Sequence, residues 1–88
     1  MNAILVEFVG TLVFLYVIIA TGNALAIGLT LALCIYLGGK ISGGNFNPAV
    51  TVMMVVAKKQ NMNTLIPYIL AQIAGGLAAI QLYKVVKI

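Results

Sequence analysis

The sequence predicts an all-α membrane protein with three transmembrane helices and one short helix that enters the membrane without crossing it. The first observation is composition. Of the residues, 64% are hydrophobic and 7% are charged, and the mean hydropathy is +1.19, well outside the range of soluble domains. The second is that three apolar segments are each close to the roughly 20 residues that cross a bilayer as a helix. The third is a polar, glycine-rich stretch between the second and third segments.

The first predicted span covers residues 3–20. Its sequence is apolar apart from four residues: Glu7, Gly10, Thr11 and Tyr16. A cleaved signal peptide is the competing interpretation, because Ala24-Leu25-Ala26 offers a small-residue cleavage pattern. A transmembrane helix is favoured, since no Lys or Arg precedes the apolar run and an acid lies within it.

The second and third predicted spans cover residues 24–40 and 64–83. A polar break after residue 20 separates the first two spans, so they form a hairpin. Lys40 ends the second span, where its long side chain can reach the headgroups. Pro67 lies in the first turn of the third span, where proline is tolerated. Small residues four apart are expected to allow close helix packing: Gly28 and Ala32 in the second span, and Ala71, Gly75 and Ala79 in the third.

Residues 41–57 are predicted to form a re-entrant loop followed by a half-helix. Irregular backbone is tolerated in a membrane only where it is buried in protein or lines a water-filled cavity. Asn47 and Pro48 mark the helix start, because Asn is a preferred N-cap and Pro suits the first helical position. From Pro48 to about Ala57 the helix would be only about 15 Å long, half of a hydrocarbon core of roughly 30 Å. Asn47 and the positive end of the helix dipole are therefore expected near the midplane.

The charged residues exclude several classes of function. The net charge is +4, and its lysines lie near the span ends, which favours contact with lipid phosphate over nucleic acid. They are Lys40, Lys58, Lys59, Lys84 and Lys87. The chain has no His, Arg or Asp, and Glu7 is its one acid, so we expect no enzyme, no metal site and no cofactor. Cys34 is the single cysteine and cannot form an intrachain disulfide.

Three motifs, in order along the chain, resemble those of the aquaporin and aquaglyceroporin family, the major intrinsic proteins. Ser42-Gly43-Gly44-Asn45-Phe46-Asn47-Pro48-Ala49-Val50-Thr51 is similar to the family's first signature loop. Glu7-Phe8-Val9-Gly10-Thr11 resembles its first-helix motif, and Pro67-Tyr68-Ile69-Leu70-Ala71-Gln72-Ile73-Ala74-Gly75 its third helix. The resemblance covers nearly the whole chain but only the first of the family's two inverted repeats, because the second Asn-Pro-Ala loop is absent. Residues 1–88 are therefore predicted to be a single half-repeat.

The resemblance implies a passive, multi-pass membrane channel for water or small neutral solutes such as glycerol. It assigns two sets of residues. The expected pore-lining residues are Asn47, Pro48, Ala49, Ile27, Val50 and Asn45. The residues expected to support the loop are Glu7, Gln72, Ser42, Gly43 and Gly44. Ile27 stands where the family usually places an aromatic residue or histidine, and Asn45 where relatives often carry histidine.

One copy cannot enclose a pore, so a second repeat is expected from elsewhere. One arrangement is an antiparallel homo-oligomeric pair, which copies the inverted repeat. The other is a hetero-oligomer with a full-length relative. The alternative function is a non-conducting fragment or an accessory subunit of such relatives. A membrane-disrupting peptide is disfavoured, because the lysines do not share one amphipathic face.

Overall fold

The computed structural model describes residues 2–87, and every regular element among them is helical. The elements are α1 (Ala3–Thr21), α2 (Ala24–Ser42), α3 (Pro48–Val56), the short 3-10 helix η1 (Met62–Thr64) and α4 (Leu65–Val85). Three helical stretches are long and apolar enough to cross a membrane: Ala3–Thr21, Ala24–Ser42 and Met62–Val85. The predicted fold class is confirmed.

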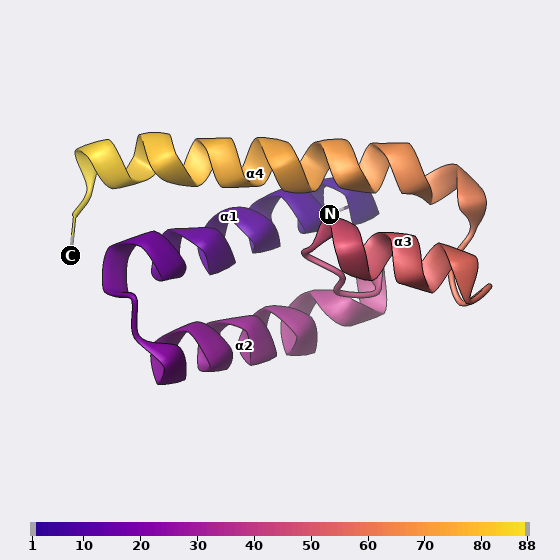
Figure 1. Cartoon of the computed structure of the whole chain (residues 1–88), viewed down its shortest axis with the longest axis horizontal. Helices are drawn as coiled ribbons and strands as arrows, with labels where there is room; N and C mark the ends of the chain where they lie inside the picture. Colours follow the sequence, from indigo (N-terminus) through magenta and orange to yellow (C-terminus); the bar gives the residue numbers. More distant parts are fainter. Residues whose placement is uncertain (1, 88) are drawn as a thin grey trace.

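The helix α1 lies at the centre of the bundle, packed against α4 on one side and α2 on the other (Figure 1). The short helix α3 packs against α4. It begins about midway along α4 and runs to the end of the bundle where α4 begins (Figure 1). The start of α3 is therefore held at mid-depth in the bundle, as expected for a re-entrant helix.

Asparagine caps begin three of the four α-helices that the structure describes. The side chains of Asn2, Asn23 and Asn47 each accept a hydrogen bond from a backbone N–H in the following turn. At the other end, α2 continues through Ser42, two residues beyond the predicted end of its span. It continues because Gly43 is the residue that takes up a left-handed conformation, with φ of 92°, and this conformation ends a helix.

The end of α3 is formed by a lysine in an unusual backbone conformation. Lys58 has φ of 61°, a region that glycine occupies at much lower cost. Its N–H donates to the Val55 carbonyl (3.0 Å), and the N–H of Lys59 donates to the Met54 carbonyl (2.9 Å). This pair of bonds is a Schellman motif, which satisfies carbonyls that the last helical turn would leave free. The helix consequently stops at 9 residues.

Glycines set the spacing between the long helices. A Cβ atom added at Gly75 would lie 2.8 Å from the Phe8 carbonyl oxygen, so α4 and α1 can approach only because that atom is absent. The predicted small face of α4 is thus buried against α1, with Ala71 and Ala79 also buried. On α2 the prediction was wrong within this chain, because Gly28 has no atom within 4 Å of its would-be Cβ. Gly38 serves this role between α1 and α2 instead, because a Cβ there would lie 2.7 Å from Val6 Cγ1.

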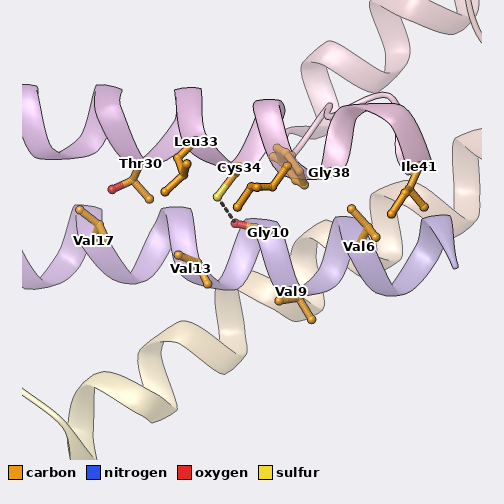
Figure 2. A pocket seen from close by; sticks show the side chains of 12 residues that line it. Val6, Val9, Gly10, Val13, Val17, Thr30, Leu33, Cys34, Gly38 and Ile41 are labelled. Carbon is orange, nitrogen blue, oxygen red and sulfur yellow. Dashed lines mark hydrogen bonds between the residues drawn. The ribbon is translucent and has the colours of Figure 1, made fainter. Parts of the chain in front are cut away.

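An apolar groove of about 550 Å³ runs between α1 and α2 (Figure 2). Valines of α1 and aliphatic residues of α2 line it. Its one sulfur contact joins Cys34 Sγ to the Gly10 carbonyl oxygen at 3.8 Å. Apart from Thr30 and Cys34, the side chains that line this face of the hairpin are hydrophobic.

Candidate functional site

The carboxyl group of Glu7 organises the re-entrant loop. Oε1 accepts hydrogen bonds from the Phe46 N–H (2.7 Å) and from Gln72 Nε2 (2.9 Å). Oε2 accepts from Ser42 Oγ (2.6 Å) and the Asn45 N–H (3.1 Å). Glu7 is 0% exposed, so its cost of burial is offset by these donors from three separate elements. The polar, glycine-rich loop that follows α2 is thereby attached to α1 and α4.

The turn that leaves α2 is fixed by Ser42. Its hydroxyl oxygen accepts from the Gly44 N–H at 3.1 Å while donating to Glu7. Its carbonyl accepts from the Tyr68 hydroxyl of α4 at 2.6 Å. Gly43 and Gly44 have φ of 92° and 66°, which a residue with a Cβ adopts at a cost. The chain therefore turns back from α2 into the loop within two glycines.

Thr51 forms a second layer behind the loop. Its hydroxyl oxygen accepts from Asn45 Nδ2 (3.0 Å) and Gln72 Nε2 (2.8 Å), and it donates to the Asn47 carbonyl (3.2 Å). Asn45 Nδ2 also donates to Gln60 Oε1 at 2.9 Å. Asn45 was expected among the pore-lining residues, but its side chain is 5% exposed and both amide hydrogens are used here. The structure therefore gives this side chain a supporting position.

Phe46 is the apolar anchor of the loop. It is 2% exposed and has φ of 54°, a left-handed conformation that is uncommon for a bulky residue. A Cβ at Gly10 would lie 2.2 Å from the Phe46 ring, so the ring occupies the space that this glycine leaves open. The bond from its N–H to Glu7 and the burial of its ring together hold the strained backbone.

Asn47 presents a free amide at the start of α3. Its Oδ1 accepts from the Ala49 N–H at 2.8 Å, and among the described residues its Nδ2 makes no hydrogen bond. Asn47 and Ala49 are exposed, whereas Pro48 and Val50 are half-buried. The amide donors and the positive end of the α3 dipole therefore lie together on an open surface at mid-depth.

The remaining predicted pore residue lies apart from the loop. Ile27 is half-buried on the first turn of α2, which begins at the end of the bundle away from α3 (Figure 1). Within one chain, Ile27 is therefore not brought together with Asn47 and Val50.

Three supporting residues were not singled out from the sequence: Thr51, Tyr68 and Gln60. A signal existed for Tyr68, because it precedes Gln72 by four residues and such pairs share one face of a helix. Thr51 follows Asn47 by the same spacing. Gln60 carried no comparable signal, since its contact to Asn45 depends on how the chain returns after α3.

The family model of the major intrinsic proteins matches residues 20–88. The glycerol uptake facilitator protein-like 6 of Lactiplantibacillus plantarum is 43% identical, over 90% of this chain and 41% of its own length. Aquaporin Z of Brucella melitensis is 46% identical, over 74% of this chain and 28% of its own. The chain thus spans less than half the length of these relatives. No solved structure gives a significant match.

Proposed function

The chain belongs to the major intrinsic protein family, and from this premise we propose that it forms one half of a passive membrane channel. The solutes are water or small neutral molecules such as glycerol. Its relatives are named as aquaporins and a glycerol uptake facilitator. A conducting path needs a second repeat, so the functional unit contains this chain and one more half.

The free amide of Asn47 is the observation that supports this proposal most directly. Its oxygen is used as the cap of α3, which fixes the orientation of the amide and leaves its N–H groups for a solute. Each N–H can donate to the oxygen of a passing water or hydroxyl. The α3 dipole adds positive potential at the same place, which opposes cations.

The exposed polar groups at the start of α3, rather than the exposed apolar surface, support the need for a second half. Large side chains along α2 are exposed, including Leu25 (71%), Leu29 (61%) and Tyr36 (80%). Lipid can cover such side chains, but it cannot satisfy the polar groups at the start of α3. A second repeat against this open side would enclose them.

An antiparallel pair of identical chains supplies that half in the simplest way. Two copies in opposite orientations reproduce an inverted repeat. Lys40 in the last turn of α2, and Lys58 and Lys59 after α3, belong to one side of the bundle, whereas Lys84 in the last turn of α4 and Lys87 belong to the other. The charge difference between the two sides is one lysine, so it gives the positive-inside rule little to act on.

A tag at the C-terminus tests this pair. Protease protection of the tag in sealed vesicles is expected to show both orientations. A tag found on one face only would exclude the antiparallel homodimer. The second half would then come from a full-length relative, and the chain would act as its accessory subunit.

The selectivity of the homodimer would be set by aliphatic residues. In the family an Arg follows the second Asn-Pro-Ala, but here Val50 takes that place. Ile27 of one copy would face Val50 of the other, with Ile35 on the remaining wall. Such a constriction offers no donors to replace water, so it favours small neutral solutes with apolar edges over strict water selectivity.

Asn47→Asp tests the role of the amide. The substitution removes the amide donors and introduces a charge where desolvation is costly. We expect flux through proteoliposomes to fall more than the amount of inserted protein. Asn63→Asp is the matched control, because Asn63 is exposed on η1. If flux and insertion fell in equal proportion at Asn47, the residue would be structural only.

A further inference from the structure

Two buried polar atoms remain without a partner beside the start of α3. They are Thr11 Oγ1 of α1 and Gln72 Oε1 of α4. Each residue is 1% exposed. A polar group left unpaired inside a membrane is costly, because no water or lipid group replaces its lost hydrogen bonds, so two of them together require an explanation.

The orientation of the Gln72 amide is fixed by its neighbours. Its Nε2 donates to Glu7 Oε1 (2.9 Å) and Thr51 Oγ1 (2.8 Å), which uses both of its hydrogens. Turning the amide over would place its oxygen against the Glu7 carboxyl group, where donors are needed. Oε1 therefore stays on the far side of the amide, as an acceptor that needs a donor.

Both residues line one pocket of about 240 Å³ between α1, α4 and the start of α3, and this cavity is partly open to the surface. Asn47 and Pro48 line the same cavity. A would-be Cβ at Gly75 lies 3.1 Å from Thr11 Cβ, which shows how closely α4 passes Thr11. The cavity exceeds the roughly 30 Å³ that one water occupies in the liquid.

We propose that this cavity is a hydration site, in which water is held by Thr11 and Gln72 beside the pore and off its axis. Water fits the chemistry because it donates to the acceptor-only Gln72 Oε1 and both donates to and accepts from a hydroxyl. The remaining lining is largely apolar, including Phe14, Leu15 and Ile73, so the water is held at the polar end. The inference rests on the proposed function in one respect: water reaches mid-depth through a hydrated pore.

Bound water would also give the Thr11 hydroxyl the partner that the protein itself does not supply. The other hydroxyls in this region are satisfied within the protein: Ser42, Thr51 and Tyr68 each make a hydrogen bond. Thr30 donates to its own helix at the Ala26 carbonyl (2.7 Å). Thr11 alone among these buried or half-buried hydroxyls has no internal partner.

Water-edited solid-state NMR of the assembled protein in lipid bilayers tests the site. Polarisation from water is expected to reach the Thr11 and Gln72 side chains, and to be weak at Thr30, which serves as the dry internal reference. Thr11→Val should abolish transfer at position 11 and reduce it at Gln72, whereas Thr11→Ser should keep both. A second variant, Gly76→Val, adds bulk on the α4 wall of the cavity, one turn beyond Gln72, and should also reduce transfer.

Flux measured on the same samples separates this inference from the proposed function. If the protein conducts and no transfer reaches Thr11 or Gln72, the hydration site is wrong and the channel stands. If transfer is present without conduction, the channel proposal fails and the site stands. A direct Thr11 to Gln72 hydrogen bond, or a donor from the second repeat occupying the cavity, would also overturn the hydration site.

Discussion

Glu7→Gln is the substitution that tests the support of the loop most sharply. It conserves shape and replaces one acceptor oxygen by an amide nitrogen. In the wild type the carboxyl group is the acceptor in all four of its hydrogen bonds. Whichever of the two oxygens it replaces, the new amide nitrogen would therefore face two hydrogen-bond donors. The less costly orientation turns it toward Ser42, because a hydroxyl can accept as well as donate.

Even in this orientation the Asn45 N–H loses its acceptor. A buried N–H left unpaired costs about 1–3 kcal/mol. The bonds from Phe46 and Gln72 persist but lose their charge assistance, since bonds to charged groups contribute about 1.5–3 kcal/mol and neutral ones about 0.5–1.5. These terms sum to about 3–6 kcal/mol. Relaxation of the loop and the lower cost of burying a neutral amide in place of a carboxylate reduce the expected destabilisation to about 2–4 kcal/mol.

Steric trapping in bicelles measures the free energy of unfolding directly. Asn63→Asp is a suitable control, because it makes the reverse exchange, amide to carboxylate, at an exposed position of η1 and should change stability little. A Glu7→Gln protein within about 0.5 kcal/mol of the wild type, the scale of an ordinary surface substitution, would refute the account of the carboxyl group as the centre of the loop.

Three further predictions concern the packing of Phe46, the hydrogen bonds of Thr51 and the proposed filter residue Val50. Gly10→Ala should destabilise the protein by about 1–3 kcal/mol in the same assay, because its Cβ would meet the Phe46 ring. Gly28→Ala should not destabilise it, because nothing lies within 4 Å of the added Cβ. Equal effects of the two substitutions would count against this packing. Thr51→Val should lower thermal stability, because valine leaves the amide donors of Asn45 and Gln72 without this acceptor. Thr51→Ser should preserve it. Equal melting temperatures for the two variants would argue against the second layer. Val50→Arg should change the ratio of glycerol to water flux, and an unchanged ratio would mean that the filter assignment is wrong.

The elements of the fold were accessible from sequence because each has a local cause. Apolar length predicts the three spans, and Asn47 with Pro48 predicts the start of α3 at the residue where the structure begins it. The extension of α2 to Ser42 was missed because two glycines in succession, Gly43 and Gly44, leave the stopping point open to tertiary contacts. The end of α3 at Val56 depends on Lys58 adopting a conformation that its type disfavours.

The contacts of the loop were only partly accessible. The resemblance proposed that Glu7 supports the loop, and the structure adds which atoms it contacts. Asn45 differs, because a side chain in a polar loop can face either a pore or its own scaffold, and Thr51 and Gln60 draw it inward. The close approach at Gly10 also escaped prediction, because Phe46 lies far from it in sequence.

Stopped-flow light scattering on the purified chain, reconstituted alone into liposomes, tests the central claim most directly. The account predicts that an osmotic step shrinks these vesicles faster than protein-free ones, with a weak temperature dependence, because two copies complete the pore. Asn47→Asp protein, inserted to the same level, should lose most of this increase. Shrinkage no faster than that of empty vesicles, from protein shown to be inserted in both orientations, would contradict the claim that the chain builds a channel by itself.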